Sequence, residues 1–342
     1  MITKFNKNLI KCIFIYNNLK DFYIKGYHKD EKVRDIMISI LNSDIELLRC
    51  NKLLVSLGEF LIKNYLYTNE ILSQRVRRYE IYHQETYRIF QEFGERGVKA
   101  LCIKTFTSIP KDIADIDILL YDDEDLKIAE KSLIEMGYKK RKKGLEQHLW
   151  TIIKNNVIID IELHTNVAAA SYIYYPKAVL FDRSEKLDTI VVPSPIDSIL
   201  LLVAHAVMKD FFITLADLLD FEVTLKKHKI DFKRLNNEAA SLGLTLPLQV
   251  FRYASSLFNP DDYKELDNIL NFFSITKLNE FPLRPNMHTV LLSYLFMTTK
   301  KLKHESFRSV LSQIIHLPTG KGIDYFVKFA FGGKPPIKGL SE

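Results

Sequence analysis

Apolar residues recur at helical spacing through the N-terminal part of the chain. The pattern is clearest in DEKVRDIMISILNSDIELLRC and YEIYHQETYRIFQEFGERG, where charged residues fill the positions between the apolar ones. Apolar positions three to four apart line one face of an amphipathic helix. Gly94 and Gly97 close the second segment, and glycine commonly ends helices. The pattern therefore predicts a helical region over residues 1–94.

Strand-like segments replace this spacing over residues 95–192. Residues 98–106 and the following ADIDILL predict two strands. DDEDLKIAEKSLIEMGY predicts a helix, because acidic residues begin it, an apolar stripe follows and Gly137 ends it. HLWTIIKNNVIIDIELHT predicts two strands joined by a turn at KNN. These elements indicate a small mixed α/β core.

The chain returns to helical spacing at Pro193. PSPIDSILLLVAHAVMKDFF opens with ordinary helix-start residues, and further helices are expected to about residue 317. The basic and aromatic segment GKGIDYFVKFAFGGKPPIKGLSE is expected to form an exposed tail. The predicted fold class is α+β, with a mixed-sheet core between a helical region over 1–94 and a helical region over 193–342.

The last predicted strand of the core separates apolar from ionisable side chains. Because side chains alternate along a strand, one face carries Val157, Ile159, Ile161 and Leu163. The opposite face carries Ile158, Asp160, Glu162 and His164. One face is therefore expected to join the core, and the other to end in two carboxylates and an imidazole.

A second pair of carboxylates lies in DIADIDILLYDD. Asp115 and Asp117 are two positions apart, so both point to one face of their strand, whereas Asp122 and Asp123 fit the start of the next helix. If the two carboxylate-bearing strands are neighbours, their like charges must be compensated. Oxygen ligands without cysteine suit Mg²⁺ or Mn²⁺, and two such ions can promote an in-line phosphoryl displacement.

Composition and charge restrict the setting of this core. The chain has 342 residues, which suggests two or three structural units, and its formal net charge of +6 permits a polyanionic partner without requiring one. Cys12, Cys50 and Cys102 have no metal-site spacing, so we expect reduced, buried thiols in a cytoplasmic protein. The most apolar stretch, residues 198–221, contains charged residues, so we expect no transmembrane segment.

The region from about residue 95 to 222 resembles the polymerase-β type of nucleotidyltransferase. It is most similar to the group called uncharacterised nucleotidyltransferases, whose members show Leu-Lys-Gly, Asp-Ile-Asp-Leu-Leu, a helix ending in Gly-Tyr or Gly-Phe, and Glu-Leu-His in that order. This chain offers IKT, DIDILL, MGY and ELH in the same order, followed by LLVAHAV and ITLADLLDF. The family's Gly-Ser element is Lys104-Thr105 here.

The resemblance implies roles for particular residues. Asp115 and Asp117 would be metal ligands, and Glu162 would be the third carboxylate and draw the proton from an acceptor hydroxyl. Asp160 is the alternative third carboxylate, and His164 is a possible substrate contact. The expected phosphate-binding residues are Lys104, Thr105 and Lys111.

The implied activity is metal-dependent transfer of a nucleotidyl group from a nucleoside triphosphate, ATP included, to a hydroxyl with release of pyrophosphate. The acceptor stays open among small molecules, proteins and tRNA. An alternative is a non-catalytic module of the same fold that binds a nucleotide or a protein, which the Lys104-Thr105 departure favours.

Two other polar features are expected to be structural. His205 and Asp217 lie in apolar helical segments, where a polar pair that supports the fold is favoured over a functional one. YKKRKKG, residues 138–144, is favoured as a solvated turn over a contact to a triphosphate or an anionic acceptor.

Overall fold

The computed structural model describes residues 7–26, 30–143, 147–169, 172–258, 282–304 and 307–316. The C-terminal tail considered above lies outside these residues. The N-terminal region is helical, as predicted, with α1 (Lys7–Lys25), α2 (Glu31–Ser43), α3 (Ile45–Cys50), α4 (Leu54–Tyr65) and α5 (Glu70–Glu95). Side chains cap two of these helices, because Asp30 accepts from Lys32 N and Asn69 accepts from Ile71 N.

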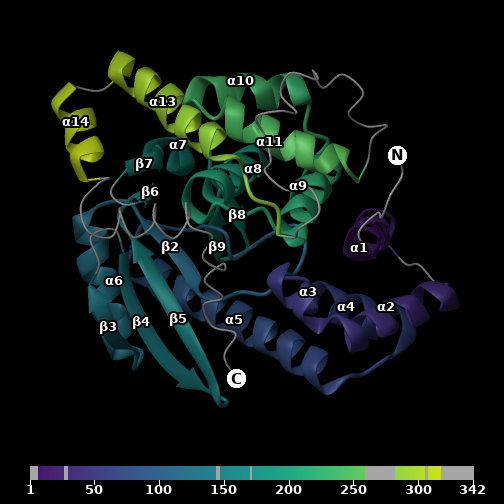
Figure 1. The fold of residues 1–342 in the computed structure, drawn as a ribbon. Helices are drawn as coiled ribbons and strands as arrows, with labels where there is room; N and C mark the ends of the chain where they lie inside the picture. The colour runs from purple at the N-terminus through teal and green to yellow at the C-terminus, as the bar shows by residue number, and fades with distance from the viewer. Residues whose placement is uncertain are drawn as a thin grey trace.

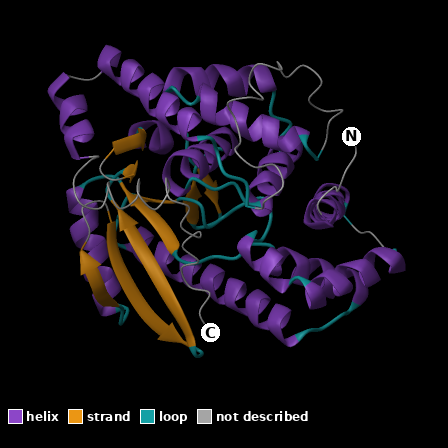
Figure 2. Ribbon diagram, viewed as in Figure 1, coloured by secondary structure: helices purple, strands orange, loops and turns teal. Residues whose placement is uncertain are grey.

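A mixed sheet follows, in the spatial order β1-β2-β5-β4-β3 (Figure 2). Its strands are β1 (Ala100–Cys102), β2 (Ile116–Leu120), β3 (Lys139–Lys143), β4 (Gln147–Lys154) and β5 (Val157–His164). β2 and β5 run parallel, and the other neighbouring strands run antiparallel. Helix α6 (Asp123–Glu135) connects β2 to β3, and Asp122 caps it as expected by accepting from Glu124 N and Asp125 N.

The two faces of the sheet pack against different helices. Ile118 and Ile161 point to the face covered by α5 and α6, where both are fully buried, and such burial contributes about 1.5–3 kcal/mol for each side chain. On the other face, Leu101 and Leu119 join a larger apolar cluster with residues of the N- and C-terminal helices. α5 and α6 therefore cover one face of the sheet, and the helical body packs on the part of the other face formed by β1 and β2 (Figure 1).

Two short hairpins, which the sequence did not indicate, follow the sheet. They consist of β6 (Val167–Ala169) with β7 (Tyr172–Tyr175), and β8 (Glu185–Leu187) with β9 (Ile190–Val192), separated by α7 (Lys177–Asp182). Each of these strands has only three or four residues, which is too few for alternation to be recognised.

The C-terminal region is helical, as predicted. Its elements are α8 (Pro195–Ala204), the π-helix η1 (His205–Asp210), α9 (Leu215–Lys227), α10 (Phe232–Leu242), α11 (Thr245–Ser256), α13 (Met287–His304) and α14 (Phe307–His316). They lie above the sheet and beside α1 in Figure 1. No helix among the described residues combines the length and the hydropathy needed to cross a bilayer.

The basic run after α6 is a strand, so its interpretation as a solvated turn was wrong. Residues 139–143 form β3 at the edge of the sheet. Lys140 forms an ion pair with Glu130 of α6, and its ammonium lies 5.3 Å from the centre of the Trp150 ring. Positive charge on an edge strand also discourages pairing with a second chain.

The cysteines form no disulfide. Cys12 and Cys102 are buried, as expected, whereas Cys50 is half-buried and its thiol donates to Glu46.

Candidate active site

The parallel pairing of β2 with β5 places Asp117 directly opposite Glu162. Paired residues on adjacent strands point to the same face at a separation of about 5 Å between strands. Both carboxylates are nearly buried, with 4% of Asp117 and 7% of Glu162 exposed to solvent. The two carboxylate-bearing strands are therefore neighbours, which the sequence alone could not establish. As a result, two carboxylates meet on one face of the sheet.

His164 completes a compact group with these two residues. Its Nε2 atom lies 2.7 Å from Asp117 Oδ1 and 3.6 Å from Glu162 Oε2. One donor atom from each residue lies within 4.8 Å of the others, and all three side chains are buried. Two carboxylates and an imidazole at this separation are a suitable donor set for a divalent cation.

Asp115 precedes β2 and is half-buried beside this group. Burial, followed by the like charges of Asp117 and Glu162, raises the pKa of Asp115 to about 7. Burial alone would also raise the pKa of Asp117, but Lys104 and His164 outweigh it and hold that pKa well below its usual range. The negative charge at this site is thus only partly compensated by protein groups, which is a setting that favours a bound cation.

Lys104 and Thr105 lie in the loop after β1. Lys104 Nζ is 2.9 Å from Asp117 Oδ1, and the lysine backbone has φ of +70°, a conformation that favours glycine. Thr105 is 2% exposed, and its hydroxyl makes no hydrogen bond to a nitrogen or oxygen atom of the described residues, although it lies near the Cys102 thiol. Lys104 therefore contacts the carboxylates, whereas the Thr105 hydroxyl is buried beside Cys102, a residue of the apolar cluster on the other face of the sheet.

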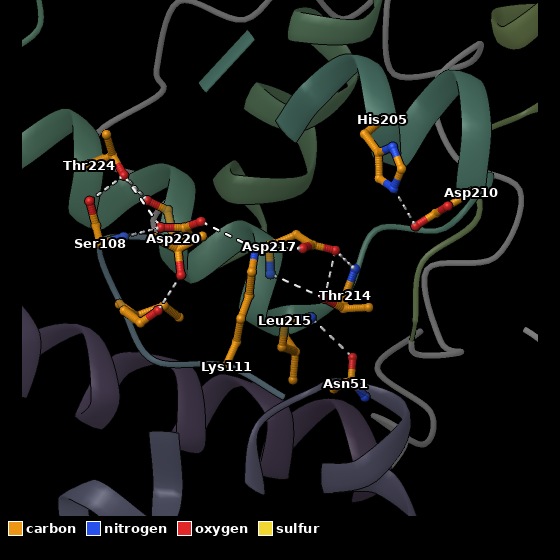
Figure 3. A network of polar contacts seen from close by, with 12 residues as sticks. Asn51, Ser108, Lys111, His205, Asp210, Thr214, Leu215, Asp217, Asp220 and Thr224 are labelled. Carbon is orange, nitrogen blue, oxygen red and sulfur yellow. Dashed lines mark hydrogen bonds and ion pairs between the residues drawn. The ribbon is translucent and has the colours of Figure 1, made fainter. Parts of the chain in front are cut away.

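Two other candidate residues have separate partners. Asp160 accepts a hydrogen bond of 2.5 Å from the Thr151 hydroxyl on β4. Lys111 lies 3.3 Å from Asp220 and 3.6 Å from Asp217, both on α9, as Figure 3 shows. Neither Asp160 nor Lys111 belongs to the group formed by Asp117, Glu162 and His164.

His205 and Asp217 each have other partners and do not contact each other, so the prediction that they form a structural pair was wrong. His205 Nε2 lies 3.3 Å from Asp210, and its Nδ1 lies 3.1 Å from the Tyr174 hydroxyl. Asp217 accepts from the Thr214 hydroxyl at 2.7 Å and begins α9 in a capping box (Figure 3).

Sequence reasoning did not single out Lys209. This residue lies on η1 and lines a small pocket together with Lys104, His164 and Tyr174. In the sequence it interrupts an apolar run, which was used only as evidence against a membrane span. Its place beside Lys104 depends on the packing of the C-terminal helices onto the sheet.

His83 of α5 packs against the loop that carries Lys104 and Thr105. Its ring centre lies 4.4 Å from that of Phe106 and 4.2 Å from that of Tyr79. Burial lowers the pKa of His83 to about 4 from an ordinary value of 6.5. Between these values the unfolded chain binds more protons, so the contribution of neutral His83 to stability is complete above pH 6.5 and is lost as the pH falls towards 4.

The variant His83→Phe should therefore weaken the dependence of stability on pH in this interval. The measurement is the free energy of urea unfolding at several pH values between 4 and 7 for the variant and the unmodified protein. Burial also lowers the pKa of His205 to about 4. Part of the dependence of stability on pH is therefore expected to remain in both proteins. Parallel curves for the two proteins would contradict the assignment to His83.

Comparison with known proteins gives one family match. The model of a family described as uncharacterised nucleotidyltransferases matches residues 66–259. Neither the search of curated proteins nor the search of solved structures returned a match. The matched residues include the sheet, the carboxylate group and helices α8 to α11.

Proposed function

Because the chain belongs to the family of uncharacterised nucleotidyltransferases, we propose that it transfers a nucleotidyl group from a nucleoside triphosphate to an acceptor hydroxyl in a metal-dependent reaction, releasing pyrophosphate. The observation that carries the proposal is the group of buried donors Asp117, Glu162 and His164 on β2 and β5. A group of this kind has no evident role in packing, because buried like charges oppose folding unless they are compensated.

Asp117 and Glu162 would hold Mg²⁺ or Mn²⁺, with Asp115 as a further oxygen ligand. When bound, such an ion neutralises charge on the phosphates and on the reacting oxygens. Glu162 is proposed as the third carboxylate in preference to Asp160, since Asp160 is already bonded to Thr151. The acceptor stays open among small molecules, proteins and tRNA.

The remaining residues would bind phosphate and move a proton. Lys104 Nζ supplies positive charge at the edge of the carboxylates. Glu162 Oε2 would accept the proton of the acceptor hydroxyl, and His164 Nε2, 3.6 Å away, stabilises the charge of the neighbouring carboxylates. Lys111 and Thr105 are retained as more distant candidates for phosphate contact.

Calorimetry with a nucleoside triphosphate, in the presence and absence of Mg²⁺, tests this proposal. We expect binding to strengthen at least about tenfold with Mg²⁺, because the ion would be shared between the carboxylates and the phosphates. Mn²⁺ should replace Mg²⁺, whereas the chelator EDTA should abolish pyrophosphate release. Binding of the same strength with and without Mg²⁺ would contradict the proposed metal dependence.

A non-catalytic module that binds a nucleotide is the second candidate. The ion pair between Lys104 and Asp117 favours it, because the ammonium occupies one carboxylate oxygen that would otherwise be available to a cation. Pyrophosphate release measured over a panel of hydroxyl acceptors separates the two. Tight nucleotide binding without release for any acceptor would support the module and not the enzyme.

A further inference from the structure

Lysines from three parts of the chain lie on the side of the sheet that carries the carboxylate group. Lys104 and Lys209 line one pocket with His164, and Lys52 lies in the turn bonded to Asp112, just before β2. Lys104 comes from the loop after β1, Lys52 from the turn between α3 and α4, and Lys209 from η1. Lys52 precedes residues 66–259, the part of the chain that matches the family model. Lys52 and Lys209 have no role in the function proposed above, so their position requires a separate explanation.

Backbone contacts fix the turn that carries Lys52. The Lys52 carbonyl accepts a hydrogen bond from Asp112 N at 3.4 Å, close to the start of β2. The preceding Asn51 accepts from Leu215 N through its side chain at 3.1 Å and from Ala216 N through its carbonyl at 3.3 Å (Figure 3). Lys52 is therefore held where the N-terminal helices, the loop before β2 and the start of α9 meet.

The side chain of Lys52 feels the charge of several carboxylates but forms no ion pair among the residues that the structure describes. Burial lowers the pKa of Lys52, but the charges of Asp217, Asp210 and Asp115 outweigh this and raise it. Within the described ranges, no carboxylate oxygen lies within 4.0 Å of its ammonium. Its charge is therefore maintained by the surroundings while its hydrogen-bond donors are available to a ligand.

Lys209 lies in an unusual stretch of backbone. It belongs to the π-helix His205–Asp210, which ends at Phe211 with φ of +58°. π-Helical turns are rare and are often found at functional sites. Lys209 lines the pocket that contains Lys104 and His164, and its charge lowers the pKa of both Asp115 and Asp117. It forms no ion pair within 4.0 Å among the residues that the structure describes.

We propose that Lys52 and Lys209, together with Lys104, bind the polyphosphate group of the nucleotide. The inference rests on the proposed function and extends it, because it assigns the phosphate site to both helical regions as well as to the sheet. Flexible ammonium groups on three sides can follow the phosphates of the substrate and of the departing pyrophosphate. The turn at Asn51 and Lys52 would thereby connect nucleotide binding to the packing of α9.

The test is calorimetry on the full chain with three probes: inorganic tripolyphosphate, a non-hydrolysable nucleoside triphosphate and the corresponding monophosphate. Lys52→Met and Lys209→Met should each weaken binding of the first two probes roughly tenfold to a hundredfold. Binding of the monophosphate, which lacks the outer phosphates, should change less than about threefold. Lys209→Arg should retain most of the affinity, because it preserves the charge.

Lys229→Met is the matched control. Lys229 is exposed and has φ of +48°, close to the +56° of Lys52, but it follows the last turn of α9, at the opposite end of that helix from Asp217. This variant should bind all three probes as the unmodified protein does.

The possible results separate the two proposals. Unchanged tripolyphosphate binding in both variants, or an equal loss of triphosphate and monophosphate binding with a lower melting temperature, would overturn the phosphate site. No tripolyphosphate binding by the unmodified protein would overturn it as well. Selective loss of polyphosphate binding, in a protein that never releases pyrophosphate, would support the phosphate site and refute nucleotidyl transfer.

Discussion

Replacing Asp117 by asparagine is expected to lower the rate of pyrophosphate release by about a hundredfold or more. Asp117 is the central member of the site, since its Oδ1 atom contacts both His164 and Lys104. An amide of the same size removes the negative charge but keeps an oxygen and the shape of the side chain. The expected loss of rate therefore reflects the metal and the reacting phosphate, and a smaller loss of stability is expected because Lys104 loses its charged partner.

Two further aspartates serve as controls for this substitution. Asp122→Asn makes the same chemical change at the N-cap of α6, where asparagine is an equally good cap, and should leave the rate unchanged. Asp160→Asn lies on the same face of β5 but disturbs only the bond to Thr151, so its effect should be less than about tenfold. Full activity of Asp117→Asn would reject the assigned site, and a loss in Asp160→Asn equal to that in Glu162→Gln would make Asp160 the third carboxylate.

The pairing of Asp117 with Glu162 shows what alternation along a strand can predict. Period-two spacing assigned Asp117 to one face of β2 and Glu162 to one face of β5, and both assignments are confirmed. Whether the two strands are neighbours was a separate condition, because strand order depends on contacts between segments far apart in the sequence. The parallel pairing of β2 with β5 satisfies that condition.

The cationic side of the site illustrates what the sequence could not show. Lys111 is close to Asp115 in the sequence, yet it contacts Asp217 and Asp220 of α9. Lys52 is far from β2 in the sequence, yet its carbonyl accepts a hydrogen bond from Asp112 N, just before that strand. Lysines are common on protein surfaces, so only the packing of helices onto the sheet distinguishes those that face a site.

The conformation of Lys104 also required a structure. A positive φ is unusual for a residue with a β-carbon, so a lysine at this position does not by itself predict it. The loop thus keeps the backbone conformation that the family's glycine adopts readily, while the lysine side chain reaches Asp117. The departure from the family pattern therefore changes the side chain beside Asp117 more than the course of the loop.

The segment that presents Lys209 depends on a buried carboxylate at the start of α8. Asp197 is fully buried, and its Oδ1 accepts from the Tyr175 hydroxyl at 2.6 Å and from Arg183 at 2.5 Å. Its Oδ2 accepts from Ser194 at 2.6 Å, within the helix start. Arg183 also reaches Glu238 of α10, at 2.7 Å. One carboxylate therefore connects β7, α7 and α8, and α8 continues directly into η1.

Asp197→Ala is consequently expected to lower the free energy of unfolding by about 2–3 kcal/mol, because the buried Tyr175 hydroxyl loses its acceptor, while Arg183, which is 34% exposed, keeps Glu238 as a partner. Asp231→Ala removes an exposed cap of α10 and should cost only about 1 kcal/mol. Urea unfolding of both variants measures the difference. The double variant Arg183→Met/Asp197→Leu should recover only part of the lost stability, since the ion pair is removed from both sides but the Tyr175 hydroxyl still lacks its acceptor. If the double variant were as unstable as the sum of its single changes, the network would stabilise the fold through shape alone, and the electrostatic account of α8 would be wrong.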